Sequence, residues 1–214
     1  MALGKKTEKP EEQMGWKENC VLYLHDVIYM LTVILIVFLL IFRVIVVSGS
    51  SMRTTLVDGD YLLLFGNLLY REPEYGDIVV VSKESFDDGK PIVKRVIATE
   101  GQTVDIDFDS GMVFVDGQAL DEPYVNTPTN LPEGVSFPLQ VEENCYFVMG
   151  DNRNSSRDSR SPEIGQVDRR EILGKAFFLM FPGTDKNNVS RDLNRMGVLK
   201  LWTKLCRSSG ILAT

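Results

Sequence analysis

A serine hydroxyl and a lysine amine are the two groups of this 214-residue sequence that could act together as a nucleophile and its base. Ser51 lies in the polar segment Gly49-Ser50-Ser51-Met52-Arg53-Thr54-Thr55-Leu56, and Lys94 lies in an apolar run further along. The one histidine, His25, lies on the far side of a long apolar run, so a serine beyond that run has no imidazole to take its proton. A lysine serves instead when its pKa falls far enough to leave the amine neutral.

The surroundings of Lys94 favour such a fall in pKa. In an extended strand, side chains alternate between faces, so Lys94 shares its face with Ile92, Val96 and Ala98. Apolar neighbours remove water from the ammonium ion and lower its pKa. The alternative is an edge-strand lysine that reaches water or pairs with a carboxylate.

Ser51 by itself carries a weaker signal. A serine in a Gly-Ser-Ser run usually belongs to an ordinary polar loop. Here Met52 and Leu56 are apolar residues that could fix the segment to a core, and Gly49 lets the backbone approach a ligand closely. We therefore interpret this segment as a loop that presents a nucleophile.

A third polar cluster, Gly150–Arg160, is dense in charge. We expect Asp151, Asp158, Arg153 and Arg160 to form ion pairs within this loop. Such a network could hold the hydroxyl of Ser156 against a lysine amine and orient it, as a third group does in other hydrolases. The alternative is a loop that is simply solvated.

The apolar run Val27–Phe42 contains sixteen residues and no charge. With its flanks it predicts a membrane-spanning helix over residues 20–43, preceded by a cytoplasmic tail at residues 1–19. Lysines before the run favour an inside N-terminus, so the rest of the chain is expected outside the cytoplasm. Two alternatives are a cleaved signal peptide, disfavoured by Arg43 before the small residues near Ser48, and a helix buried in a larger core.

After the anchor the pattern predicts a mostly antiparallel, all-β catalytic domain at residues 44–182 and a C-terminal tail at 183–214. The proline-rich stretch 118–144 is expected to run over the surface. Within the tail, Val198–Leu205 is either a short amphipathic helix or poorly ordered. The expected strands are Tyr61–Phe65, Ile78–Ser82, Ile92–Thr99, Thr103–Phe108, Met112–Val115, Tyr146–Met149 and Lys175–Phe181.

Composition excludes several function classes. The net charge is −7 and no basic stripe appears, so nucleic acid is not expected as a partner. The three cysteines, Cys20, Cys145 and Cys206, match no metal-binding spacing, although Cys145 and Cys206 could pair in an oxidising compartment. We expect no metal and no cofactor.

Taken together, these residues resemble bacterial type I signal peptidases, also called leader peptidases. Five segments occur in that family's order, and with the anchor they cover residues 20–182. They are Gly49–Leu56, Tyr75–Val80, Ile92–Ile97, Gly150–Arg160 and Ile172–Phe178.

The resemblance implies a Ser–Lys dyad on a β domain of the kind shared with self-cleaving repressors. It also implies preproteins as substrates, which are cut at the bilayer surface after a small-x-small motif. In these terms Ser51 is the nucleophile and Lys94 the base, while Ser156 orients Lys94. Asp158, Arg153 and Arg160 support the site, and the Ser51 N–H contributes to an oxyanion hole. By the same analogy five residues line pockets for small side chains: Val47, Met52, Leu56, Ile92 and Val93.

The sequence also departs from the family's pattern. Thr54 stands where proline is usual, and Gly49 stands where some members carry a serine hydroxyl. Ser48 or Ser50 is therefore the expected second oxyanion donor. Gln102 and Asn154 each replace a common aspartate.

Two rival functions remain open. Self-cleaving repressor peptidases share the chemistry but are soluble and carry a DNA-binding module, which this sequence lacks. A catalytically inactive, membrane-tethered binding protein on the same scaffold is the other possibility. Reaction of Ser51 with a serine-directed probe separates this second rival from an enzyme.

Overall fold

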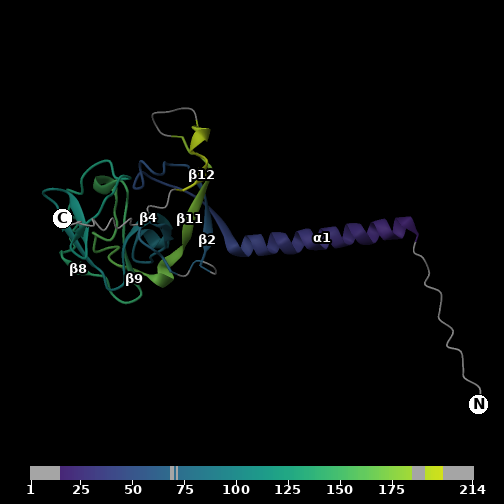
Figure 1. The fold of residues 1–214 in the computed structure, drawn as a ribbon, viewed down its shortest axis with the longest axis horizontal. Helices are drawn as coiled ribbons and strands as arrows, with labels where there is room; N and C mark the ends of the chain where they lie inside the picture. Colours follow the sequence, from purple (N-terminus) through teal and green to yellow (C-terminus); the bar gives the residue numbers. More distant parts are fainter. Residues whose placement is uncertain (1–14, 68–69, 71, 185–190, 200–214) are drawn as a thin grey trace, which may run out of the picture. The chain divides into compact units, whose positions relative to one another are not determined.

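The computed structural model describes residues 15–67, 70, 72–184 and 191–199. The chain divides into two units between Leu40 and Ile41. The first holds one long helix, and the second holds the β domain (Figure 1).

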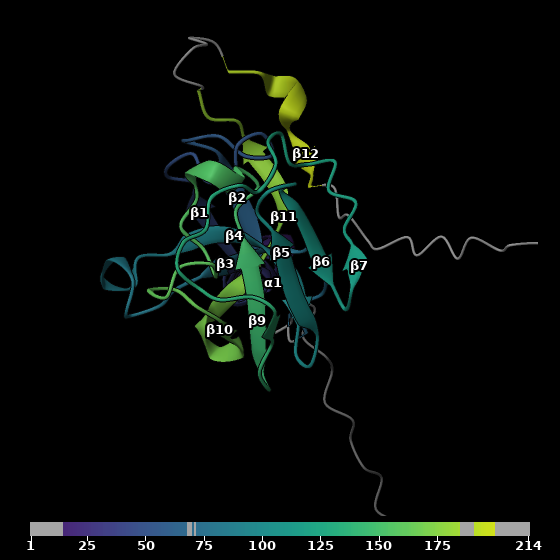
Figure 2. The ribbon, with the colours of Figure 1, turned by 90° about the vertical axis from the view of Figure 1, so that its left-hand side faces the viewer.

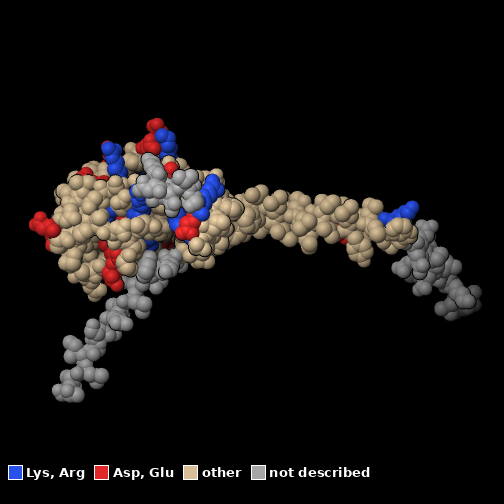
Figure 3. All heavy atoms as spheres, turned by 90° about the horizontal axis from the view of Figure 1, so that it is seen from above, with Lys and Arg blue, Asp and Glu red and all other residues tan. Residues whose placement is uncertain are grey.

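The helix α1 runs from Trp16 to Ile41. Its segment Asn19–Ile41, 23 residues long, is long and apolar enough to cross a membrane. Its apolar side chains are exposed, not packed into a protein core, and Figure 3 shows no charged patch along most of the cylinder. This helix fits the predicted membrane-spanning segment.

The expected bounds of the anchor, residues 20–43, need correction at both ends. The helix begins at Trp16, which lies inside the expected tail, so it includes polar residues that precede the apolar run. It ends at Ile41 because Phe42–Val46 forms strand β1 and pairs antiparallel with strand β2, Tyr61–Gly66. The β domain therefore starts two residues earlier than predicted.

The larger sheet has eight strands, and every pairing in it is antiparallel. Its order is β1-β2-β11-β3-β4-β9-β10, and β12 pairs with β11. The remaining bounds are β3 Ile78–Val81, β4 Ile92–Thr99, β9 Cys145–Met149, β10 Val167–Asp168, β11 Ile172–Phe181 and β12 Gly197–Val198.

A second sheet of four strands has the order β7-β6-β5-β8. Figure 2 shows β5, β6 and β7 side by side. Their bounds are β5 Thr103–Asp107, β6 Met112–Val115, β7 Gln118–Ala119 and β8 Leu139–Gln140. Four short 3-10 helices lie at Asp87–Gly89, Arg153–Ser155, Arg169–Glu171 and Leu193–Arg195. The prediction of an all-β, mostly antiparallel domain is confirmed.

The seven predicted strands are all present; β4 and β6 have the predicted bounds, and the ends of the other five are shifted by up to three residues. The short strands β7, β8, β10 and β12 were not predicted, because two residues are too few to show alternation. The stretch 118–144 is more buried than expected, since Tyr124, Thr129 and Val141 are buried.

The predicted C-terminal tail is also partly wrong. Val198 lies in β12 and pairs with Phe178 of β11, so a helix does not begin there. Leu199 is buried in the core of the domain. Residues 200–205 of the possible amphipathic helix lie outside the described part of the chain, as does Cys206 of the possible disulfide.

Candidate active site

Ser51 lies in a loop between β1 and β2, residues 48–59, which we call the nucleophile loop. Two backbone hydrogen bonds close its base, from Val47 N to Asp60 O at 2.8 Å and from Gly59 N to Val47 O at 2.9 Å. Met52 and Leu56 are 1% and 0% exposed, and they anchor the loop in a core cluster. The apolar residues that bracket the serine in the sequence therefore fix its position.

Lys94 contacts Ser51, although β11 and β3 lie between β2 and β4 in the sheet. Its Nζ donates a hydrogen bond of 2.8 Å to Ser51 Oγ. The lysine side chain comes from β4, which buries six consecutive residues, Val93 to Ala98. The sequence placed both residues in the site, and the structure brings them into direct contact.

Burial lowers the pKa of Lys94 to about 8 from an ordinary value of 10.5. The lysine is 3% exposed. The negative charges of Asp158, Glu133 and Asp151 oppose this fall, while the positive charge of Arg160 adds to it. At pH 7 roughly a tenth of Lys94 is therefore a neutral amine, far more than for a lysine of ordinary pKa, and the neutral amine is the form that a base for Ser51 requires.

The loop Gly150–Arg160 packs directly against the nucleophile loop. Asn152 N donates to Ser51 O at 2.9 Å, and Asn152 Nδ2 donates to Ser50 O at 3.0 Å. A Cβ added at Gly150 would lie 2.5 Å from Ser51 O. Only glycine lets the two loops come this close.

Ser156 is buried beside this contact but does not bond to Lys94. A Cβ at Gly150 would lie 2.2 Å from Ser156 Oγ, so Ser156 and Ser51 flank the same narrow space. The hydroxyl makes a long 3.5 Å bond to the carbonyl of Arg157, and no hydrogen bond joins Ser156 to Lys94 among the described residues. Its expected role as an orienting group remains a prediction.

The ion pairs of the Gly150–Arg160 loop differ from the expected set. Arg160 and Asp158 do pair within the loop, through bonds of 2.8 and 2.9 Å. Arg153 pairs instead with Glu122, to which Nη1 donates at 2.8 Å. Asp151 pairs with Arg95 of β4. Asp151 and Arg153 therefore have their ion-pair partners outside the loop, and Arg160 pairs with Glu133 outside the loop as well as with Asp158 inside it.

Arg95 is the most important residue that sequence reasoning missed. Its Nε and Nη2 donate to the two oxygens of Asp151 at 2.8 and 2.6 Å, and its Nη1 donates to Gly76 O at 2.8 Å. The guanidinium also lies 4.0 Å from the centre of the Tyr124 ring. The signal was present, since an arginine inside an apolar strand needs a buried acidic partner.

Glu133, from the proline-rich stretch, is a second missed residue. Its Oε1 lies 3.0 Å from Arg160 Nη2, although neither carboxylate oxygen has a well-directed hydrogen bond from another described residue. Burial and the nearby Asp158 raise the pKa of Glu133. It adds a further carboxyl group to the electrostatic surroundings of Lys94.

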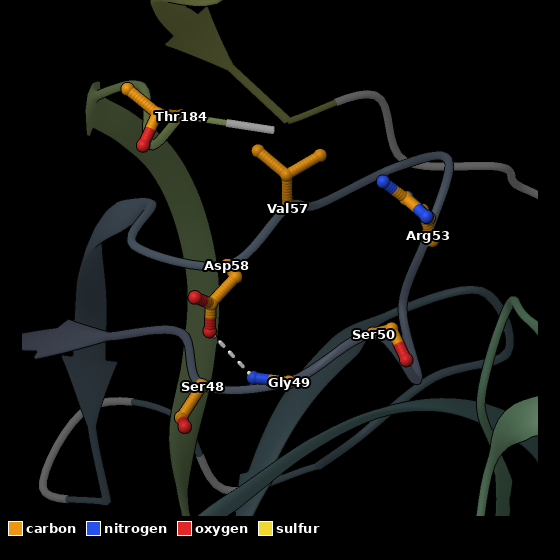
Figure 4. Close-up of a pocket in the computed structure, with 7 residues that line it drawn as sticks. All are labelled: Ser48, Gly49, Ser50, Arg53, Val57, Asp58 and Thr184. Carbon is orange, nitrogen blue, oxygen red and sulfur yellow. Dashed lines mark hydrogen bonds between the residues drawn. The ribbon is translucent and has the colours of Figure 1, made fainter. Parts of the chain in front are cut away.

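The backbone before Ser51 leaves a donor available for an oxyanion. No described acceptor bonds the Ser51 N–H, whereas the Gly49 N–H donates to Asp58 Oδ1 at 2.8 Å. Gly49 has a φ of +94°, which glycine adopts readily. A cavity of about 410 Å³ opens at this segment, and Ser48 and Ser50 lie on either side of the Gly49–Asp58 bond (Figure 4). The residues that line this cavity are Ser48, Gly49, Ser50, Arg53, Val57, Asp58 and Thr184.

Thr54, where the resembled family usually has proline, is held by its own hydroxyl. Thr54 Oγ1 donates to Tyr124 O at 3.4 Å. The threonine thus makes a contact that a proline lacks. It links the nucleophile loop to the proline-rich stretch.

Four of the five residues expected to line substrate pockets belong to one core cluster. Val47, Met52, Leu56 and Val93 are each at most 8% exposed. Ile92 packs against a different cluster. These side chains leave little open surface near Ser51.

Among the described residues, no group of three His, Cys, Asp or Glu side chains is arranged to hold a metal ion. Cys145 is a free thiol whose pKa is raised by burial. The described reactive groups of the site are the Ser51 hydroxyl and the Lys94 amine.

Comparison with known proteins gives a consistent assignment. The family described as signal peptidase, peptidase S26, matches residues 20–181. A signal peptidase I from Bacillus licheniformis is 32% identical over 181 residues, which cover 80% of this chain and 95% of the relative. A probable signal peptidase I-1 from Synechocystis sp. is 37% identical over 147 residues, covering 64% and 70%.

A crystal structure of a signal peptidase I from Enterococcus faecalis V583 is 30% identical, covering 49% of this chain and 96% of that chain, with a TM-score of 0.40. Ser51, Lys94 and the whole Gly150–Arg160 loop fall inside the region that the family matches. The chain belongs to the signal peptidase family, peptidase S26.

Proposed function

We propose that this protein is a serine endopeptidase of the signal peptidase I type that works by a Ser51–Lys94 dyad. The observation that carries the proposal is the 2.8 Å hydrogen bond from Lys94 Nζ to Ser51 Oγ. The lowered pKa of Lys94, about 8, supports its role as a base. The substrates proposed are preproteins with signal peptides, cut after a small-x-small motif.

The reaction proceeds in two halves. Neutral Lys94 takes the proton of Ser51 Oγ, and the oxygen attacks the scissile carbonyl carbon. The Ser51 N–H donates to the developing oxyanion, and Ser48 or Ser50 is the proposed second donor. The protonated lysine then gives its proton to the leaving amine, which leaves an acyl-enzyme. Water, deprotonated by Lys94, hydrolyses that ester and restores the serine.

Each further residue has a proposed part. Asp158, Arg153 and Arg160 hold the Gly150–Arg160 loop, and Gly49 allows the turn into Ser51. Ser156 is a positioning residue whose hydroxyl lies beside the dyad. The residues proposed to lie beside a small substrate side chain are Val47, Val93, Met52, Leu56 and Ile92, the first four of which are at most 8% exposed.

The helix α1 supports a membrane tether. We propose a cytoplasmic N-terminus and a catalytic domain on the outer face, following the lysines before the apolar run. Tethering enzyme and preprotein to one bilayer raises their effective concentration. An extended cleavage site could then pair its backbone with an exposed strand edge beside the nucleophile.

The proposal is tested with the full-length protein in detergent and a purified preprotein. Ser51→Ala and Lys94→Ala are each expected to abolish cleavage, while Lys90→Ala, an exposed lysine nearby in the sequence, keeps it. A serine-directed lactam or lipopeptide probe should label the wild type but not Ser51→Ala. Wild-type turnover in either dyad variant would refute the proposal, and absence of labelling in the wild type would favour an inactive binding protein.

A further inference from the structure

The segment Asp192–Leu199, which we call the C-terminal strap, lies beyond the residues that the family matches, 20–181. It nevertheless folds onto the β domain. Its strand β12 extends the large sheet beside β11, and Leu199 N donates to Phe177 O at 2.8 Å. The Leu199 side chain, 8% exposed, joins the core cluster that contains Met52 and Leu56 of the nucleophile loop.

A buried ion pair joins the strap to the base of the nucleophile loop. Arg195 donates to Asp60 through two bonds, Nη1 to Oδ1 at 3.0 Å and Nη2 to Oδ2 at 2.7 Å. The Asp60 side chain is 0% exposed and Arg195 only 25%. Such bidentate arginine–carboxylate pairs are among the strongest and most directional in proteins.

Asp60 is the point at which three separate parts of the chain meet. Besides Arg195, its oxygens accept from Val57 N at 2.8 Å and from Gly183 N at 2.7 Å. Val57 belongs to the nucleophile loop, and Gly183 follows β11. The two oxygens therefore accept from four N–H groups. The two that belong to Arg195 also bring the positive charge that compensates the carboxylate.

Arg195 also contacts the nucleophile loop directly. Its Nη2 lies 3.4 Å from Thr55 O and donates to it. On its other side Thr55 donates through Oγ1 to Asp151, the partner of Arg95. The loop that carries Ser51 is thus held from the Gly150–Arg160 side by Asn152 and Asp151, and from the opposite end of the chain by Arg195.

We propose that Arg195 is a positioning residue that holds the nucleophile loop in its reactive conformation. The inference rests on the proposed function, because it takes Ser51 as the nucleophile. Removing the guanidinium leaves Asp60 as a buried charge whose remaining donors are two backbone amides. The loop then relaxes around Val57 and Thr55, and Ser51 Oγ moves away from Lys94 Nζ.

The test uses full-length protein in detergent and measures how fast a serine-directed lactam probe acylates Ser51. We expect Arg195→Ala to acylate about tenfold more slowly than the wild type, since small displacements of a reacting group have large effects on rate. Arg195→Lys, which keeps the charge but not the fork, should fall in between. Arg191→Ala removes the same charge from an exposed neighbour and should match the wild type.

Three readouts separate positioning from a general loss of fold. Millimolar guanidinium chloride should restore part of the rate in Arg195→Ala but not change Arg191→Ala. With preprotein, kcat should fall while KM stays within about twofold, as for an interaction that matters mainly in the transition state. Hydrogen exchange at the amide of Val57 should accelerate. Because Arg195 is not among the main charges acting on Lys94, the midpoint of the pH–rate profile should stay in place.

The outcomes distinguish the two proposals. If Ser51→Ala is still acylated, the proposed nucleophile is wrong. If Ser51→Ala is silent but Arg195→Ala reacts like Arg191→Ala, the positioning role of Arg195 is overturned while the dyad survives. A rate loss in Arg195→Ala that follows only the unfolded fraction, with no rescue by guanidinium, also overturns it.

Discussion

Arg95 and Asp151 form a bidentate ion pair in which neither side chain is more than 1% exposed. Arg95 is the neighbour of Lys94 on β4, and Asp151 is the second residue of the Gly150–Arg160 loop that packs on the nucleophile loop. The pair therefore joins the strand that carries the base to the loops around the nucleophile. Its burial also means that neither charge has water to replace a lost partner.

This arrangement predicts a large loss of stability when the pair is broken. Asp151→Asn should lower the free energy of unfolding by about 3 kcal/mol or more, because Arg95 is left as an uncompensated buried charge. The matched control is Glu163→Gln, which removes a carboxylate from the exposed pair with Arg157 and should cost less than about 1 kcal/mol. The free energy of unfolding of both variants and of the wild type is measured by urea denaturation. Equal losses in the two variants would contradict the structure.

The cleavage rate should rise with pH through about 8 as Lys94 loses its proton. Only the neutral amine can accept the proton of Ser51, so the rate is low well below that pH and levels off above it. The measurement is a profile of kcat/KM against pH on the full-length enzyme. A rate that is unchanged from pH 5 to 10 would argue against a lysine base.

The same pKa makes a prediction about stability. The pKa of Lys94 is about 8 in the folded chain and 10.5 ordinarily, so between these values the unfolded chain binds more protons and stability rises with pH. Below pH 8 the buried ammonium costs roughly 3 kcal/mol. Lys94→Met should therefore be inactive yet more stable than the wild type at pH 7, with the gap narrowing towards pH 10.5.

Denaturant unfolding at pH 7, 9 and 10.5 measures that gap. The stability of Lys94→Met relative to the wild type should fall steadily across the series. Lys90→Met, at an exposed lysine, should show no such trend. A gap independent of pH would mean that Lys94 is not buried as an ammonium ion.

Gly150 should not tolerate a side chain. Its Cβ would lie 2.2 Å from Ser156 Oγ and 2.5 Å from Ser51 O, so Gly150→Ala forces the two loops apart. We expect a loss of activity of about a hundredfold, since the nucleophile is displaced by a large part of an ångström. Gly101→Ala is the control, because its Cβ meets nothing within 4 Å and its φ of +78° adds only local strain. Comparable activity in the two variants would show that the loops can separate without harm.

Ser156→Ala tests whether the buried hydroxyl assists Lys94. If Ser156 comes to hydrogen-bond the amine during the reaction, Ser156→Ala should lower kcat by about tenfold or more and shift the pH midpoint. Ser155→Ala, at an exposed neighbour in the same loop, should leave both unchanged. If Ser156→Ala behaves like Ser155→Ala, the Ser156 hydroxyl does not assist Lys94 and serves only in its long hydrogen bond to Arg157 O.

The sequence by itself determined the features that depend on local pattern. An uninterrupted apolar run predicted the helix α1, and a short run rich in β-branched residues predicted the bounds of β4. The types of residue around Ser51 and Lys94, with a single histidine before the run, predicted which hydroxyl and which amine would meet.

Only the tertiary structure decided which charges pair. Asp151 lies 56 positions from Arg95, and Arg153 lies 31 positions from Glu122, and several acidic residues were equally plausible partners for each. The two-residue strand β12 and the reach of Arg195 back to Asp60, 135 positions away, were likewise absent from any local pattern. Periodicity records which face of an element is buried, whereas the choice of partner for a buried charge depends on which distant segments the packed sheet brings together.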